Sequence, residues 1–286
     1  MNGQAEGLRR LVQQASPKRA RCARVIAITS GKGGVGKSNL AANMGAYLAS
    51  SGQRTAVLDA DLGLANVNIL LGVNPMYDIG HVISGQKRLL EIGVPGPAGL
   101  QLFPGGSGLY EVANLSPWRL ETFLCSLAEV EEVYDLLLVD TGAGLSEAVI
   151  KLVLSAAEVL LVTTPEPPAL ADAYGMVKII AQRSPGARVH VVVNMVRQIG
   201  EGQMVFQHLW QGAQRFLGFE LNLLGEVPYD PAVNRAVQEQ TPFVLAYPRS
   251  PAGRAVAEVA SELIGTRTPT AGGLRGLIRR MWRARG

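Results

Sequence analysis

The chain has 286 residues, of which 48% are hydrophobic and 17% charged, and its net charge is +4. A chain of this length and composition can bury a large core as one domain or at most two. No uncharged apolar run reaches the roughly 18 residues that cross a bilayer, and no signal-peptide pattern opens the sequence. Two cysteines, Cys22 and Cys125, are too few for a disulfide framework. The composition therefore predicts a cytoplasmic protein.

The positive charge is concentrated at the two ends of the chain. Residues 1–24 carry six Lys or Arg against Glu6, a net +5, and residues 271–286 carry five Arg and no acid. The residues between them therefore carry a net charge of −6. A basic protein often binds nucleic acid, but that function needs the charge on a domain face. Nucleic acid is not the expected partner, and the tails need their own explanation.

The middle of the chain alternates apolar runs rich in Val, Ile and Leu with stretches of helical length. The expected strands are Val25–Thr29, Thr55–Asp59, Leu136–Asp140, Val159–Thr163, Arg188–Asn194 and Leu223–Val227. The expected helices cover residues 38–51, 117–132, 145–156, 168–183, 202–217 and 250–264. Strands that are apolar on both faces and joined by helices are typical of a covered parallel sheet. We therefore expect a doubly wound α/β domain over residues 25–265, mostly parallel, with helices on both faces.

A glycine-rich segment joins the first expected strand to the first expected helix. It reads Gly31-Lys32-Gly33-Gly34-Val35-Gly36-Lys37-Ser38, the pattern Gly-x-x-x-x-Gly-Lys-Ser of a phosphate-binding loop. Its backbone amides can donate hydrogen bonds to phosphate oxygens, and the positive end of the helix dipole attracts their negative charge. Lys37 is expected to neutralise the β- and γ-phosphates of ATP, and the Ser38 hydroxyl to coordinate Mg²⁺. The expected phosphate-binding residues are Gly33, Gly34, Val35, Gly36, Lys37, Ser38 and Asn39.

An acidic residue ends another apolar strand. Asp140 closes the run in "YDLLLVDTGAG", where a carboxylate can hold the water shell of the metal. The alternative is an Asp that caps the next helix. Together with the loop, Asp140 predicts a site for ATP and Mg²⁺.

Four motifs together resemble a known family. The runs "KGGVGKS", "VLDADLGLANVNILLG", "DLLLVDTGAG" and "LVTTPEPPALADAY" are similar to those of the deviant Walker A ATPases of the MinD/ParA group. Within that group they most resemble the flagellar-number regulators of the FlhG type, also called YlxH or FleN. The resemblance spans about residues 20–264 and implies a P-loop ATPase that forms a homodimer around ATP.

The resemblance also implies roles for individual residues. Lys32, the second lysine of the loop, would reach the phosphates bound by the partner subunit, where its charge acts much as an arginine finger does; the alternative is a solvated loop lysine. Asp61 would orient the attacking water and Asp59 would support the magnesium shell. The expected catalytic residues are thus Lys32, Lys37 and Asp61, and the expected metal residues are Ser38, Asp59, Asp61 and Asp140.

Three asparagines and a proline receive less specific expectations. By the same resemblance Asn66 would lie at the dimer seam, Asn194 would read the base, and Pro228 would line the adenine pocket. Asn68 stands where many relatives have Asp, so no role is assigned to it.

The C-terminal residues 274–286 have the pattern of an amphipathic helix. Leu274, Leu277, Ile278, Met281 and Trp282 fall on one helical face, and arginines fill the rest. This pattern is typical of a helix that lies on an anionic membrane surface. The alternative is a core helix, but Gly272-Gly273 and the expected linker 266–273 favour a helix apart from the domain.

The N-terminal residues 1–24 resemble a partner-binding segment. "GQAEGLRRLVQQ" is similar to the sequence by which FlhG proteins stimulate the signal-recognition-type GTPase FlhF. Gln4, Ala5, Leu8 and Arg9 match, whereas Gly3 replaces an Asp and so weakens a helix cap. Gln4, Leu8 and Arg9 are the expected contacts with the GTPase.

The favoured interpretation is an ATPase that cycles between the cytoplasm and the inner face of the cell membrane. It would set flagellar number or placement and stimulate an FlhF-type GTPase, with flagellar basal-body components as further partners. A MinD-like division-site ATPase and a ParA-like DNA-segregation ATPase are the alternatives. The apolar residues of the C-terminal segment have no use in the DNA-binding alternative. An iron–sulfur carrier of the same superfamily would need a Cys-x-x-Cys motif, which the sequence lacks.

Overall fold

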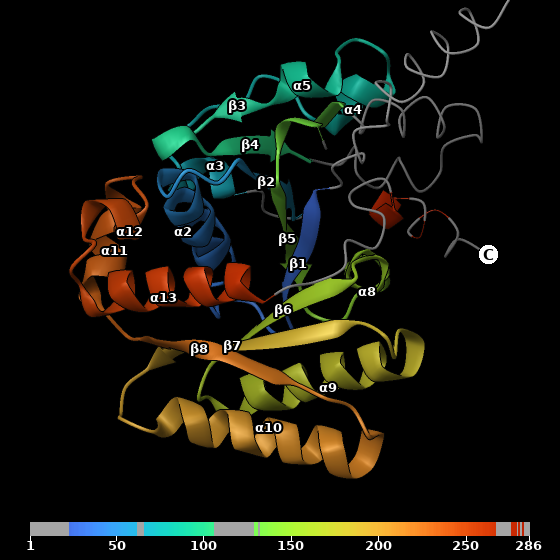
Figure 1. Ribbon diagram of the computed structural model, residues 1–286, viewed down its shortest axis with the longest axis vertical. Helices are drawn as coiled ribbons and strands as arrows, with labels where there is room; N and C mark the ends of the chain where they lie inside the picture. Colours follow the sequence, from blue (N-terminus) through green and yellow to red (C-terminus); the bar gives the residue numbers. More distant parts are fainter. Residues whose placement is uncertain are drawn as a thin grey trace, which may run out of the picture.

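The computed structural model describes residues 23–61, 66–105, 129–130, 132–266, 276–278, 280 and 282. In this part of the chain one sheet has the strand order β3-β4-β2-β5-β1-β6-β7-β8. Its strands are β1 (Arg24–Ser30), β2 (Thr55–Ala60), β3 (Val94–Pro95), β4 (Gln101–Pro104), β5 (Leu136–Ala143), β6 (Glu158–Thr163), β7 (Arg188–Val196) and β8 (Asn222–Pro228). All neighbours pair in parallel except β3 and β4, which are antiparallel (Figure 1).

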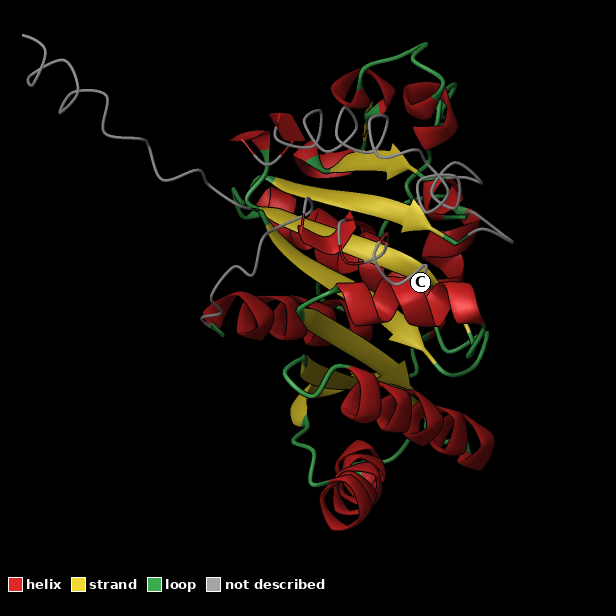
Figure 2. Ribbon diagram, turned by 90° about the vertical axis from the view of Figure 1, so that its right-hand side faces the viewer, coloured by secondary structure: helices red, strands yellow, loops and turns green. Residues whose placement is uncertain are grey.

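Helices follow most of these strands. They are α2 (Lys37–Ser50), α3 (Val67–Leu70), α4 (Ile79–Ile83), α5 (Leu89–Ile92), α8 (Glu147–Ser155), α9 (Pro167–Arg183), α10 (Glu201–Leu217), α11 (Pro231–Gln238), α12 (Phe243–Ala246) and α13 (Pro251–Gly265), with a 3₁₀ turn at Pro97–Gly99. Figure 2 shows the helices, in red, on both sides of the yellow strands. The predicted doubly wound fold is confirmed, as are its six strands and five of its helices. The expected helix 117–132 lies mostly outside the described residues.

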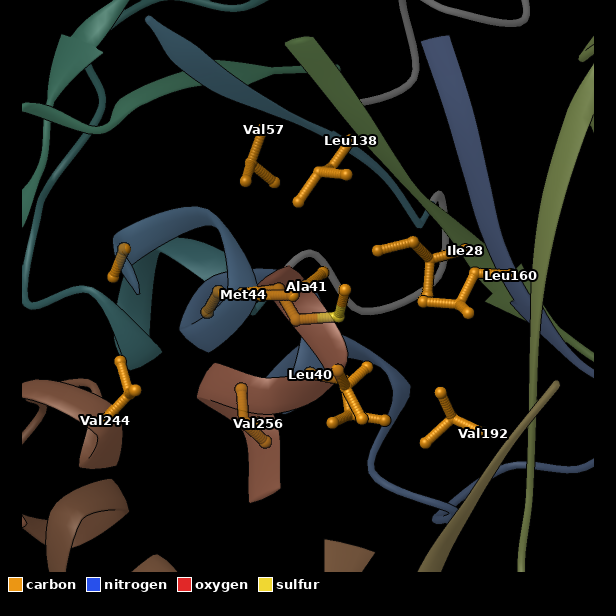
Figure 3. Close-up of a cluster of buried hydrophobic side chains, with 14 of the residues drawn as sticks. Ile28, Leu40, Ala41, Met44, Val57, Leu138, Leu160, Val192, Val244 and Val256 are labelled. Carbon is orange, nitrogen blue, oxygen red and sulfur yellow. The ribbon is translucent and has the colours of Figure 1, made fainter. Parts of the chain in front are cut away.

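Along each strand, successive side chains point to opposite faces of the sheet. Ile26 and Ile28 of β1 point to the face covered by α2 and α13, whereas Val25 and Ala27 point to the other face. Figure 3 shows Leu40, Ala41 and Met44 of α2 packed between the sheet and Val256 of α13. The opposite face is covered by α8, α9 and α10, and also by α4 and α5. Because both faces are buried, the strands read as nearly continuous apolar runs in the sequence.

The described C-terminal residues pack on the domain. Leu277 and Ile278 are 0% and 1% exposed and belong to the core cluster formed with α4, α5 and the C-terminal half of α8. Trp282 packs against the same cluster, and Arg280 Nε donates a hydrogen bond of 2.6 Å to the Ser155 carbonyl. The segment therefore lies against the domain, whereas we expected the linker to hold it apart. Without lipid, the domain offers the apolar surface that its side chains need.

Candidate functional site

The loop between β1 and α2 has the backbone shape that its glycines permit. Gly34 and Gly36 have φ angles of 81° and 87°, in the left-handed region that glycine tolerates. A Cβ at Gly36 would collide with the side-chain amide of Asn194, and a Cβ at Gly31 would collide with the backbone of Asp172 in α9. The loop is thus fixed between β7 and α9, and it opens α2 with Gly36 at the N-cap position.

A buried ion pair lies directly behind this loop. Lys37, only 6% exposed, places its Nζ atom 2.8 Å from Asp140 Oδ1 and 3.4 Å from the Ser38 hydroxyl. The pair forms because β5 lies beside β1, with Asp140 opposite Ile28. The second carboxylate oxygen of Asp140, Oδ2, is buried and has no hydrogen-bond partner within the described part of the chain. The predicted phosphate lysine and metal-site acid therefore meet at one point.

A second buried acid lies beside the first, on the neighbouring strand β2. Asp59 of β2 is 2% exposed and is the register partner of Asp140. Its two oxygens accept hydrogen bonds of 3.2 Å from the backbone amides of Asp61 and Val67. Burial, followed by the charge of Asp140, raises the pKa of Asp59 to about 6. Burial also raises the pKa of Asp140, although Lys37 opposes that effect.

These acids have the chemistry of a divalent-cation site. Magnesium prefers oxygen ligands and keeps several waters, which buried carboxylates and a serine hydroxyl can hold. The Oδ2 atom of Asp140 has no hydrogen-bond partner among the described residues, and Asp59 is buried beside it, so both carboxylates are placed where a cation could bind. Ser38, Asp59 and Asp140 therefore fit the predicted Mg²⁺ site.

Asp61 and Asn66 stand on either side of residues 62–65, which lie outside the described part. A Cβ built at Gly142 would lie 3.6 Å from an Asp61 carboxylate oxygen, so Asp61 projects toward the end of β5. Asn66 is the N-cap residue of α3, and its buried Oδ1 atom has no hydrogen-bond partner among the described residues. Asp61 thus lies near the end of β5 beside the buried acids, whereas the place of Asn66 at a dimer seam stays a prediction.

A pocket opens beside the loop at the ends of β7 and β8. Gly36, Asn194, Pro228 and Phe243 contribute to its lining, and it has about 460 Å³ of empty volume, part of it open to solvent. Asn194 donates a 2.8 Å hydrogen bond from Nδ2 to the Val35 carbonyl, which connects the pocket to the phosphate loop. The expected base-binding residues Asn194 and Pro228 are therefore brought together next to Asn39, which also lines the pocket.

Lys32 makes a contact that the sequence analysis did not predict. Its Nζ atom lies 2.9 Å from Glu166 Oε2, and the two side chains are 39% and 64% exposed. Glu166 is the N-cap residue of α9 and belongs to the quoted run "LVTTPEPPALADAY". To predict this ion pair from the sequence, one would have to know that the loop lies against α9. That position depends on the order of the strands in the sheet.

The P-loop, the acids and the pocket agree with the family match of the sequence. Residues 26–243 match the CobQ/CobB/MinD/ParA nucleotide binding domain. The chain belongs to this family. It is 39% identical to the antiactivator FleN of Pseudomonas aeruginosa, over 84% of this chain and 85% of that protein. It is 34% identical to the flagellum site-determining protein YlxH of Helicobacter pylori, over 92% and 91% of the two chains.

Solved structures of MinD/ParA-type proteins have the same fold. The cell division protein MinD of Aquifex aeolicus, in a MinC:MinD complex, has a TM-score of 0.69 at 28% identity and covers 86% of this chain and 98% of that one. The septum site-determining protein MinD of Pyrococcus horikoshii, complexed with Mg-ADP, has a TM-score of 0.67 at 26% identity, over 84% and 96% of the chains. The resemblance deduced from the four motifs is therefore confirmed.

Other expected sites of this MinD/ParA-type protein lie outside the described residues. These are Gln4, Leu8 and Arg9 at the N-terminus and Leu274 and Met281 at the C-terminus. Their roles stay predictions. Among the helices that the structure describes, none combines the length and apolar character needed to cross a membrane.

Proposed function

We propose that this protein is an ATPase that dimerises with ATP and Mg²⁺, cycles onto the inner face of the cell membrane, and regulates the number or placement of flagella. The observation that carries the proposal is the buried contact of Lys37 with Asp140 behind a loop that has a second lysine. Similarity to an antiactivator FleN and to a flagellum site-determining protein supports the flagellar role.

The buried charged residues suggest how the site binds nucleotide. On nucleotide binding, the ammonium group of Lys37 would leave Asp140 and contact the β- and γ-phosphates. The carboxylate and the phosphates are both anions that this one ammonium group can reach. Asp140, with Ser38 and Asp59, would then help to hold Mg²⁺, whose charge would lower the cost of keeping both acids ionised. Asp61 would position the attacking water. The bound metal supplies neutralisation of phosphate charge.

The second lysine, Lys32, explains why ATP hydrolysis would depend on dimerisation. Within one chain Lys32 pairs with Glu166, and an ion pair as exposed as this one is worth at most about 1 kcal/mol. Lys32 can therefore leave Glu166 at little cost when a partner subunit presents phosphate. The cation then reaches the site only on dimerisation, which makes hydrolysis depend on the partner.

Membrane binding would require the C-terminal segment to leave the domain. Leu277 and Ile278 cannot contact lipid while they are buried in the core cluster. One released segment binds weakly, because ordering it offsets much of the gain from burial in lipid. A dimer presents two segments and gains avidity, so ATP-driven dimerisation would favour the membrane.

Lys32→Ala tests the proposal. The variant keeps Lys37 and its own phosphate contacts, so it should bind ATP but stay monomeric in size-exclusion chromatography with ATP and Mg²⁺, and hydrolyse little. The parent should dimerise, and its specific activity should rise with protein concentration. Lys178→Ala, which removes an exposed lysine from α9, is the matched control and should behave as the parent. A Lys32→Ala protein that dimerises and hydrolyses ATP at the parent rate would contradict the proposed role.

A MinD-like division-site ATPase is the second candidate, because the MinD structures share the fold over most of the chain. Both candidates use the same nucleotide chemistry. They differ in the N-terminal segment, which only the flagellar regulator would use to stimulate a partner GTPase.

A further inference from the structure

Met195, near the end of β7, is a half-buried residue with a left-handed backbone. Its φ angle is 60°, a conformation that glycine adopts freely and that is unfavourable for a bulky side chain. Ala98 and Gln240 are the other non-glycine residues with a positive φ in the described part of the chain, and neither lines the pocket beside the phosphate loop. Met195 does line it. Because glycine would avoid the strain at this position, the methionine side chain is expected to have a use there.

The left-handed residue is the extra residue of a bulge in β7. The pairing of β7 with its neighbour β8, which lies beside it in Figure 1, shifts register between Asn194 and Val196. In a regular strand, alternate side chains share a face, so Met195 would follow Val193 into the cluster under α9 and α10. Val196 takes that place instead. A bulge re-aims side chains in this way, and here it turns both Asn194 and Met195 toward the pocket.

Both side chains reach the phosphate loop from this position. Asn194 donates its 2.8 Å hydrogen bond from Nδ2 to the carbonyl of Val35. A Cβ built at Gly36 would lie 3.6 Å from the Cε methyl group of Met195, so this methyl group borders the loop at the residue that caps α2. The backbone amides that follow this cap are the ones expected to face phosphate. The bulge therefore connects the pocket to the phosphate loop.

We propose that Met195 is a positioning residue for nucleotide binding. Its side chain packs beside Gly36, and the bulge that it occupies keeps the Asn194 amide on the Val35 carbonyl. The inference rests on the proposed binding of ATP and deepens it. The phosphate loop and the pocket are held in one arrangement before ATP arrives, so less conformational freedom is lost on binding.

Met195→Gly is the test, because glycine keeps the left-handed backbone and removes only the side chain. In isothermal titration calorimetry with Mg²⁺, the affinities for ATP and for inorganic tripolyphosphate should both fall roughly threefold to tenfold, since a half-buried apolar contact is lost. Tripolyphosphate has no base, so it reports on the loop alone. The free energy of unfolding without nucleotide should change little, because relief of the strained backbone opposes the loss of packing.

Two further variants are the controls. Met195→Leu keeps an apolar side chain of similar volume and should restore binding nearly to that of the parent. Ala98→Gly relieves a left-handed backbone with a φ angle of 56° at a residue outside the pocket, and should bind ATP and tripolyphosphate as the parent does.

Each other outcome overturns the inference. If Met195→Gly binds ATP as tightly as the parent, the side chain positions nothing. If it binds ATP more weakly but tripolyphosphate equally well, Met195 contacts the base or ribose and does not act on the loop. Weaker binding with an equal loss in the free energy of unfolding would make the role structural. A parent that binds ATP but not tripolyphosphate has no preformed loop, whereas a parent that does not bind ATP contradicts the proposed function itself.

Discussion

Two carboxylates and a lysine lie together at the nucleotide site, where burial raises the pKa of both acids and the charge of Lys37 opposes that rise. Asp140 has Lys37 at 2.8 Å, whereas Asp59, within the described part of the chain, accepts hydrogen bonds of 3.2 Å from two backbone amides. The sequence alone identified all three side chains from local motifs. It did not reveal that Lys37 contacts Asp140, because that contact depends on β5 lying beside β1.

The raised pKa of Asp59 predicts an unusual pH dependence for the metal-free protein. An acid whose folded pKa is about 6 and whose unfolded pKa is near 3.8 binds its proton more tightly when folded. Its contribution to the free energy of unfolding is therefore full below pH 4, falls as pH rises to about 6, and totals about 3 kcal/mol.

Asp59→Asn should abolish this contribution. The free energy of unfolding of the parent minus that of the variant, from urea denaturation in EDTA, should fall by about 2 kcal/mol between pH 4 and 6.5. Taking the difference cancels the titrating groups that do not interact with Asp59; Asp140 does interact with it and contributes to the difference. A difference that is constant over this range would show that Asp59 is not desolvated as the structure indicates.

Asp61→Ala should separate binding from hydrolysis. Lys32, Lys37 and Ser38 stay in place, so the variant should bind ATP and dimerise, but the attacking water loses the carboxylate that orients it. We expect hydrolysis to slow by about 10²–10⁴ and an ATP-bound dimer to accumulate on vesicles. Glu220→Ala, an exposed acid after α10, is the control. Hydrolysis at the parent rate would exclude Asp61 from this role.

At the scale of elements, the sequence predicted what local pattern determines. The long crossover helices and the six apolar strands were identified because their apolar residues recur over many positions. The strands β3 and β4 and the helices α3, α4, α5 and α12 were missed because they have only two to five residues each.

The C-terminal segment was misplaced for a different reason. A stripe of apolar side chains with arginines around it suits a lipid surface and a domain groove equally well, so its pattern does not say which one covers it.

Arg280→Lys should weaken the docking of the C-terminal segment without changing its charge. Lysine lacks the guanidinium Nε that donates to the Ser155 carbonyl, and a hydrogen bond from a charged group is worth about 1.5–3 kcal/mol when buried. Since Arg280 is partly exposed, we expect a smaller effect, a roughly threefold to tenfold increase in vesicle binding with ADP. Arg254→Lys on α13 is the control. Equal binding of parent and variant with ADP would mean that this contact does not hold the segment.

At the scale of the whole molecule, the nucleotide site lies at one end of the sheet, and Arg24 and Thr266, where the described domain begins and ends, lie together at the other. The site lies where β1, β2 and β5 end, whereas Arg24 opens β1 and Glu158 opens β6. Helix α8 connects the two ends, because it begins just after the turn that follows β5 and ends at the Ser155 carbonyl. A nucleotide-dependent shift at the end of β5 therefore has a rigid element through which to reach the C-terminal segment.

The N-terminal segment has one proposed partner, the FlhF-type GTPase. The contacts expected for the GTPase, Gln4, Leu8 and Arg9, precede a basic cluster, Lys18, Arg19 and Arg21, to which no contact is assigned. A peptide of residues 1–24 should therefore raise the GTP hydrolysis rate of an FlhF-type GTPase. The Arg9→Ala peptide should lose this effect, because a few side chains supply most of the binding energy of a small interface. The Lys18→Gln/Arg19→Gln/Arg21→Gln peptide should keep it. Measured as phosphate release at saturating peptide, equal stimulation by the parent and Arg9→Ala peptides, or none by the parent, would remove the GTPase from the partners of this protein and favour the MinD-like alternative.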